Sequence, residues 1–327
     1  MDASSDSLDP TSADPGRTAE AAGVPFRSRL GLPPPFLYIG AISLLYVGLG
    51  SLVQAAQLPV GLLWSQIFLF IWPSLNLVRR YGFHPLRFIR ADRPPRRPGL
   101  VVGVSAGAFL CASGAMALLE AAVPRQWLRD DVPQLLTDQA GPWGVVLFIG
   151  VIVGAPLAEE TVFRGCLLPM LATRMPLRRA IVWQAVLFSL IHFDPVGFLP
   201  RLVLGLAFGA LWVGTGSIWA SVFAHALNNG VSSAILLWFG QGDLPDPSSS
   251  DLWLALLVTL GGGASLALCL WLLARTGPGS VAHRPLPDAE PASLALPCTG
   301  RDLRRASWRY TAAAIAGLGL VALAARL

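Results

Sequence analysis

Residues 142–163 read PWGVVLFIGVIVGAPLAEETVF, an apolar run that carries no charge before its two adjacent glutamates. An α-helix rises about 1.5 Å per residue, so about 20 apolar residues cross the hydrocarbon core of a bilayer. The run has that length and shows no alternation of polar and apolar residues, which argues against a β-strand. We therefore predict that it forms a membrane-spanning helix.

Similar runs fill most of the chain. Of its 327 residues, 54% are hydrophobic and 13% are charged, a balance that a soluble domain with a solvated surface does not have. The sequence predicts an all-α, polytopic transmembrane helix bundle with eight or nine spans, because the fifth run is short and the ninth is rich in Ala and Gly. The spans are expected near residues 36–57, 59–78, 100–123, 142–163, 180–193, 197–213, 217–238, 252–274 and 310–325.

These spans divide the chain into four parts. Residues 1–35 are rich in Ser, Asp, Pro and Gly and are predicted to form a disordered polar N-terminal tail. The other parts are N-terminal transmembrane helices at 36–141 with an arginine-rich loop at 79–99, a core at 142–240, and C-terminal transmembrane helices at 241–327 with a loop at 275–309.

The arginines orient the predicted bundle, since basic loops stay on the cytoplasmic side. The loop at 79–99 holds seven arginines and one acidic residue, and the loops at 164–179 and 275–309 are also basic. The loops at 124–141 and 239–251 contain aspartates and are placed outside. We expect an integral, multi-pass protein, in the cell membrane if the source is prokaryotic, with a cytoplasmic N-terminus.

Composition also excludes some chemistry. All 24 basic residues are arginine, which rules out a Schiff-base lysine, a Ser–Lys dyad and a P-loop. The arginines lie in loops beside apolar runs rather than along one polar face, so we expect membrane lipid and no nucleic acid as a partner. The four cysteines have no C-x-x-C spacing, so neither a disulfide framework nor a thiolate metal site is expected.

Ionisable side chains inside the predicted spans are the strongest functional signal, because a charge at mid-bilayer costs about 2.5–3.5 kcal/mol. Glu160 and Arg164 share one helix face at i and i+4, so Arg164 can neutralise Glu160. Glu159 points about 100° away from Glu160 and is left to act as a general base. The alternative is that both glutamates only end a span near the interface and pair with cytoplasmic arginines.

Two histidines lie in other spans. Phe188 and His192 are one turn apart, and so are His225 and Asn229. Each histidine has an alternative reading, His192 as a buried core residue and His225 with Asn229 as a hydrogen-bonded contact between helices.

Together these groups can perform hydrolysis of an acyl bond in two ways. A carboxylate, two imidazoles and a carboxamide supply a base for water and donors for an oxyanion. Alternatively, Glu159, His192 and His225 are three ligands of a catalytic zinc site with one open position. The H-E-x-x-H motif is absent, so the spacing does not choose between them.

The three pairs of residues resemble the motifs of the CPBP family of intramembrane proteases, which includes CAAX prenyl endopeptidases of the Rce1 type and bacterial Abi proteins. E-E-x-x-x-R appears as Glu159, Glu160 and Arg164, F-x-x-x-H as Phe188 and His192, and H-x-x-x-N as His225 and Asn229. The motifs occur in this order over about residues 142–240. The Gly205-x-x-x-Gly209 helix and a Gly-Ser turn at 216–217 accompany them.

The resemblance implies an intramembrane endopeptidase whose cavity opens toward the cytoplasm and which cleaves a peptide bond near that face. Glu159 and His192 would activate the attacking water, His225 and Asn229 would stabilise the oxyanion, and Glu160 with Arg164 would form a structural ion pair. The substrate would be a peptide or protein, lipidated in the CAAX members. Members are often called metalloproteases, so zinc remains an alternative and no cofactor is taken as certain.

Two other classes of function stay open. One is a proton-coupled transporter, in which Glu159, His192 and His225 form a proton relay, although the sequence shows no internal repeat. The other is a catalytically silent scaffold or immunity protein.

Glu159 and His192 are predicted to lie at different depths in the bilayer, although a shared site requires them to meet. Glu159 falls near the cytoplasmic end of its span and His192 more than halfway across, so a helix must tilt or enter late, or a boundary must be off by a turn. Asp194 and Pro195 are expected to start an outer turn, with Arg201 reaching the same interface.

Overall fold

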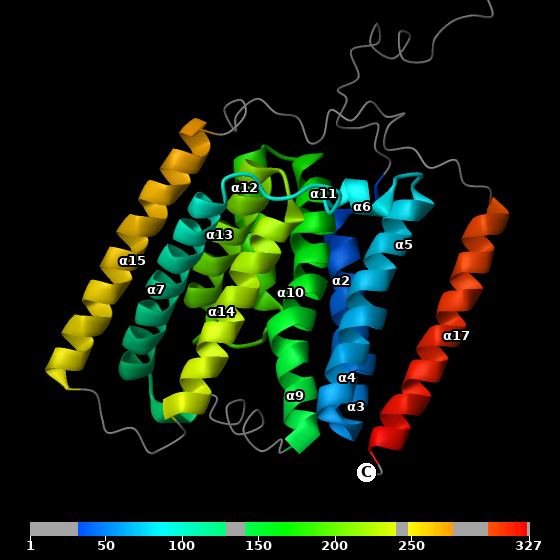
Figure 1. Cartoon of the computed structure of the whole chain (residues 1–327), viewed down its shortest axis with the longest axis horizontal. Coiled ribbons are helices and arrows are strands. Elements are labelled where there is room, and N and C mark those ends of the chain that lie inside the picture. The colour runs from blue at the N-terminus through cyan, green and yellow to red at the C-terminus, as the bar shows by residue number, and fades with distance from the viewer. Residues whose placement is uncertain (1–31, 129–140, 240–247, 277–299, 326–327) are drawn as a thin grey trace, which may run out of the picture.

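The computed structural model describes residues 32–128, 141–239, 248–276 and 300–325, and every regular element among them is a helix. The prediction of an all-α membrane helix bundle is confirmed. The helices stand side by side, with α15 (Ser249–Thr276) at one edge and α17 (Gly300–Ala324) at the other (Figure 1). The predicted tail up to residue 31, and most of the predicted loops at 124–141, 239–251 and 275–309, lie outside the described residues.

Six of the described helices are long and apolar enough to cross a membrane, so the predicted count of eight or nine spans is not confirmed. They are Pro35–Ala56, Leu58–Arg80, Pro98–Ala122, Gly141–Ala172, Phe198–Thr215 and Ser249–Arg275, and Thr311–Ala324 is a shorter apolar helix. The predicted fifth and seventh spans are also helical, as α12 (Leu177–Leu190) and α14 (Ile218–Phe239). Helix α12 is too short to cross the bilayer, and α14 carries a histidine and two asparagines.

The first, second and fourth of these spans are each built from consecutive segments without a break. Pro35–Ala56 joins α2 (Pro35–Leu45), η2 (Tyr46–Gly50) and α3 (Ser51–Ala56). Leu58–Arg80 joins α4 (Leu58–Ser65), η3 (Gln66–Ile71) and α5 (Trp72–Arg80). Gly141–Ala172 joins α9 (Gly141–Ile149), η5 (Gly150–Gly154), α10 (Ala155–Glu160), η6 (Thr161–Leu167) and α11 (Leu168–Ala172).

The fourth span differs from its predicted bounds of 142–163. Its helix continues to Ala172, so the predicted loop at 164–179 shrinks to a short connection before α12. The reason is Arg164, which was counted as a loop residue but is fully buried and paired with Glu160. A neutralised charge does not end a span.

Helices α12 and α13 (Phe198–Thr215) form a short hairpin. The 14 residues of α12 extend about 21 Å, less than the roughly 30 Å core of a bilayer. Both helices end above the lower end of α14 in Figure 1. The connection at residues 191–197 therefore lies above the lower end of α14, and the predicted outer turn at Asp194 and Pro195 stays a prediction.

Small residues bring these helices together. A Cβ at Gly205 would meet the Cβ of Ala185 at 2.9 Å, and one at Gly209 would meet Gln184 Nε2 at 2.7 Å. Helices α12 and α13 can therefore approach closely only because both positions are glycine.

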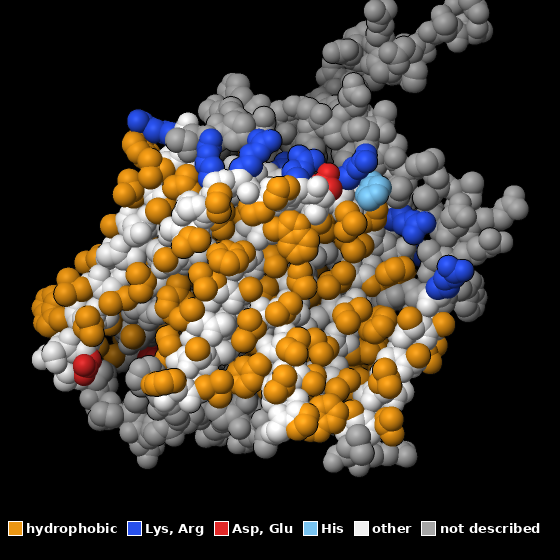
Figure 2. Space-filling view, viewed as in Figure 1, with side chains coloured by type: hydrophobic (Ala, Val, Ile, Leu, Met, Phe, Trp, Pro, Cys, Tyr) orange, Lys and Arg blue, Asp and Glu red, His pale blue; other side chains and the backbone are white. Residues whose placement is uncertain are grey.

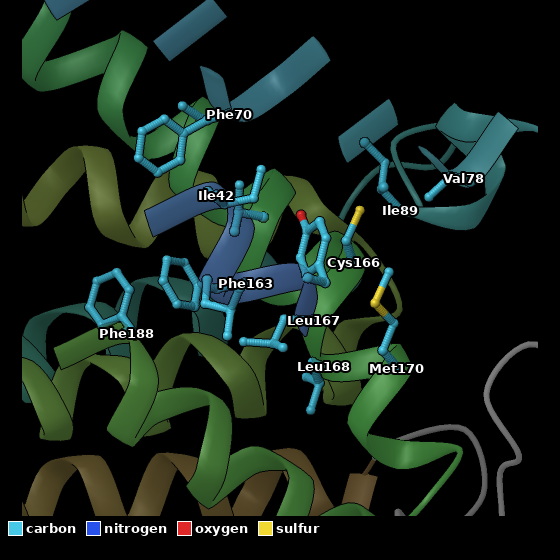
Figure 3. Packing of buried hydrophobic residues seen from close by; sticks show 14 of the residues in the cluster. Ile42, Phe70, Val78, Ile89, Phe163, Cys166, Leu167, Leu168, Met170 and Phe188 are labelled. Atoms are coloured by element: carbon cyan, nitrogen blue, oxygen red, sulfur yellow. The ribbon is translucent and has the colours of Figure 1, made fainter. Parts of the chain in front are cut away.

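The largest buried core surrounds the fourth span. Residues 162–171 are all buried, and Figure 3 shows Phe163 and Leu167 packed near Ile42 of α2 and Phe188 of α12. This core fixes the helix that carries both glutamates.

The arginine-rich loop is tied to the C-terminal end of α13. It contains the short helix α6 (Pro85–Phe88) and leads to α7 (Pro98–Ala122). Trp212 Nε1 donates to the Ile89 carbonyl at 3.3 Å, and the Arg90 guanidinium lies 4.0 Å from the centroid of the Trp212 ring. Figure 2 shows the loop's end of the molecule rimmed by basic residues above a broad apolar belt. The distribution is that of an integral, multi-pass membrane protein.

Candidate active site

The structure brings together three ionisable residues that are far apart in the sequence. Glu159 lies in α10, His192 directly after α12, and His225 in α14. The Nε2 atom of each histidine lies 3.9 Å from Oε2 of Glu159. The Glu159 and His192 side chains are 21% and 29% exposed, so the cluster is reachable from outside the packed core.

The greater length of the fourth span explains how Glu159 and His192 come to lie at the same depth in the bundle. Because the helix ends at Ala172, Glu159 lies about 20 Å along the axis from that end rather than near it. His192 lies about as far from the start of α12 at Leu177. Both residues are therefore near the middle of the bundle.

Glu160 is the centre of a buried charge network. Its Oε1 atom accepts a hydrogen bond from Arg164 Nη1 at 2.8 Å and lies 2.9 Å from His225 Nδ1. The Glu160 and Arg164 side chains are fully buried. The bond to His225 was not foreseen from the sequence, because 65 residues separate the two partners.

A backbone carbonyl at the close contact of α12 and α13 completes the network. Arg164 Nη2 donates to the Gly205 oxygen at 3.1 Å, and Gln184 Nε2 donates to the same oxygen at 2.8 Å. Gln184 was missed in the sequence, although an amide within an apolar helix was a usable signal. Through Gly205, the position of the ion pair depends on how α12 and α13 pack.

Aromatic rings enclose the histidines. Phe208 stacks on His225 with ring centroids 5.1 Å apart, and Phe188 meets His192 edge-on at 5.2 Å. Phe188 also lies 4.5 Å from the Arg164 guanidinium. These buried rings pack against both imidazoles and the guanidinium and restrict the orientation of the histidine side chains.

Hydrogen bonds set which nitrogen of each histidine faces Glu159. His192 Nδ1 lies 2.8 Å from the Phe188 carbonyl oxygen, which can only accept, so we assign the proton to Nδ1. The carboxylate of Glu160 imposes the same tautomer on His225. When an imidazole is neutral and carries its proton on Nδ1, it presents an unprotonated Nε2 toward Glu159.

Asn229 is tied to the helix that carries the glutamates. Its Nδ2 donates to the Val151 carbonyl at 2.9 Å, and Gln66 Nε2 donates to the Gly150 carbonyl at 2.9 Å. Both carbonyls belong to the π-helical segment η5, where the usual helical bonding is interrupted. One N–H of Asn229 is used in this way, and the carboxamide has a second.

The three predicted zinc ligands are neighbours but do not form a metal site as they are placed. Among the described residues, no group of three His, Cys, Asp or Glu side chains is arranged to hold a metal ion.

The fold and the site define a multi-pass helical membrane protein with a carboxylate and two imidazoles gathered within the bundle. Residues 141–231 match the family of type II CAAX prenyl endopeptidase Rce1-like proteins. The segment that carries the site is therefore similar to that family of membrane proteases.

The chain is also similar to a curated protein of Bacillus subtilis (strain 168), named "Putative membrane peptidase YdiL". The two are 29% identical over 96 residues, which cover 29% of this chain and 39% of that protein. No solved structure matches the chain. The family match covers the segment that carries the site.

Proposed function

We propose that the protein is an intramembrane endopeptidase that hydrolyses a peptide bond with water activated by Glu159 and His192. One observation carries the proposal. Oε2 of Glu159 is buried, has no hydrogen-bond partner among the described residues, and faces two imidazole Nε2 atoms at 3.9 Å. Gaps of that size between polar atoms are suited to a bridging water molecule.

The reaction follows from general acid–base chemistry. Glu159 takes a proton from the water as its oxygen attacks the carbonyl carbon of the scissile bond, assisted by His192. The resulting tetrahedral oxyanion collapses, the C–N bond breaks, and the proton held by Glu159 passes to the departing amine. The products are a carboxylic acid and an amine.

His225 and Asn229 are proposed to stabilise the oxyanion. Asn229 can donate its second N–H, because the first is used by the Val151 carbonyl. His225 donates Nδ1–H to Glu160, so its Nε2 can donate to an oxyanion only when the ring is an imidazolium. Glu160 and Arg164 hold these groups in position.

The substrate is proposed to be a peptide or protein that reaches the bundle from the membrane, lipidated or not. Because Glu159 lies about 20 Å along the helix from Ala172, cleavage occurs within the bilayer rather than at its cytoplasmic face. This position differs from the expectation in the sequence analysis, which placed cleavage near the cytoplasmic face. The arginine-rich end is proposed to be cytoplasmic, with the N-terminus on that side.

Three alternatives predict different measurements. A zinc ion bound by Glu159, His192 and His225 predicts loss of cleavage on chelation. A proton-coupled transporter predicts uptake that depends on a pH gradient, and a silent scaffold predicts that the motif residues can be replaced without effect.

The decisive experiment is cleavage of a mixed library of lipidated and unlipidated peptides by detergent-purified protein, with and without a chelator. We expect wild type to cleave and Glu159→Gln to lose activity by about 10²- to 10⁴-fold, the usual contribution of a general base. Glu120→Gln, at an exposed position of α7, is the matched control. Full activity of Glu159→Gln would exclude the mechanism.

A further inference from the structure

A wide helical turn precedes the two glutamates of the fourth span. In η5 the backbone N–H of Ala155 donates to the Gly150 carbonyl, five residues back rather than the four of an α-helix. The extra residue rotates the residues after the turn by about 100° about the helix axis, compared with a regular helix. Glu159 follows Ala155 by four residues, so the wide turn decides which way its carboxylate points.

Gln66 of η3 holds this turn from a second helix. Its Nε2 donates at 2.9 Å to the Gly150 carbonyl, the acceptor that defines the wide turn. The rest of its amide lies along the turn, because a Cβ at Gly154 would overlap Gln66 Oε1. The next carbonyl, that of Val151, accepts a hydrogen bond from Asn229 of α14 at 2.9 Å. The turn is therefore bound by side chains from two other helices.

Stability alone does not account for a glutamine at this position. Gln66 is 5% exposed, and its Oε1 is buried without a hydrogen-bond partner within the described part of the chain. Such an oxygen is costly in the interior, and the Gly150 carbonyl already has a backbone partner in Ala155. A methionine would fill the same space and leave no buried carbonyl unpaired. The amide therefore contributes direction to the turn rather than net stability.

We infer that Gln66 is a positioning residue: by holding the wide turn of η5, it aims Glu159 at the two histidines and fixes the carbonyl that Asn229 contacts. This inference rests on the proposed peptidase function and adds to it a residue outside the segment that matches the family, 141–231. Because Gln66 acts through the backbone of η5, loss of its amide should slow the chemical step and leave substrate binding unchanged.

The test compares Gln66→Met with wild type in detergent. We expect kcat for peptide cleavage to fall by about 10- to 100-fold with KM little changed, because a misplacement of about 1 Å can cost about 10²-fold. The unfolding temperature should stay close to that of wild type, since methionine keeps the volume and removes the unpaired oxygen. Gln54→Met is the matched control. Gln54 of α3 donates to Ser65 Oγ at 3.3 Å, so its loss should leave kcat unchanged.

A second variant tests the contact from the other side and decides alone if Gln66→Met does not fold. Gly154→Ala places a Cβ against Gln66 Oε1 and should displace the amide, so kcat should fall as it does in Gln66→Met. In the Gln66→Ala protein the amide is no longer there, and Gly154→Ala should change kcat by less than about twofold. Such non-additivity shows that both residues act through one contact.

Hydrogen exchange gives a readout that does not depend on cleavage. The backbone amides of residues 150–160 should exchange about 2- to 10-fold faster in Gln66→Met than in wild type or Gln54→Met, the worth of one hydrogen bond. Unchanged exchange, or a kcat that falls only with the folded fraction, would overturn the role of Gln66. Faster exchange in a protein whose wild type does not cleave would support that role and refute the peptidase. Cleavage by wild type with an unchanged kcat in Gln66→Met would do the reverse.

Discussion

His225 Nδ1 lies 2.9 Å from Glu160 Oε1, the same oxygen that accepts a hydrogen bond from Arg164 at 2.8 Å. One carboxylate oxygen thus joins the buried ion pair to an imidazole that faces Glu159. The ion pair and the site are therefore one network, so a change at Glu160 should act on both stability and catalysis.

Glu160→Gln should lower the free energy of unfolding by about 3–5 kcal/mol, because Arg164 is left as an uncompensated buried charge. Cleavage by the remaining folded protein should also fall, since an amide in place of the carboxylate no longer fixes the orientation of the His225 ring through Nδ1. Chemical denaturation in detergent and single-turnover cleavage measure the two effects. Normal stability, beside an unaffected Glu120→Gln control, would contradict the buried pair.

Phe208→Ala should reduce both stability and activity, because the ring is almost fully buried and stacks on His225. Loss of a buried phenylalanine costs about 3–5 kcal/mol. Phe208→Leu keeps most of the volume but not the stacking, so it should recover stability more than kcat. Thermal unfolding and kcat of the two variants separate these effects, and equal recovery of both quantities would argue against a role for the stacked ring.

The sequence predicts contacts within one helix better than contacts between helices. The spacing of Glu160 and Arg164 places them on one face, and the structure has them hydrogen-bonded at 2.8 Å. The bond of Gln184 to the Gly205 carbonyl joins two helices, and no spacing rule specifies it. Such contacts depend on how the helices pack against one another, and the spacing of residues in a single sequence does not predict that packing.

The end of the fourth span was mispredicted for a related reason. Hydropathy treats Arg164 as a charge in a loop, but Glu160 neutralises it inside the bundle, and the helix runs on to Ala172. The depth of the site follows from that extension.

Gly205→Ala should be destabilising by about 1–3 kcal/mol, the usual cost of overpacking. Its new Cβ would meet Ala185 at 2.9 Å and push apart the helices whose contact places the Gly205 carbonyl against Arg164 and Gln184. Gly261→Ala is the control, because nothing lies within 4 Å of a Cβ there and α15 should gain slightly from alanine. Melting temperatures of both variants test the prediction, which fails if Gly205→Ala is as stable as wild type.

Asn229→Asp should impair cleavage more than Asn229→Ala does. Alanine only removes the hydrogen bond to the Val151 carbonyl and one proposed oxyanion donor, whereas aspartate places an acceptor against that carbonyl and a negative charge beside the developing oxyanion. We expect a loss in kcat of about 10²- to 10³-fold for alanine, the usual worth of one oxyanion donor, and a larger loss for aspartate. A purely structural Asn229 predicts instead that cleavage falls only in proportion to the folded fraction. Measuring kcat and thermal unfolding on the same preparations separates the two roles, because an oxyanion donor lowers kcat in protein that is fully folded.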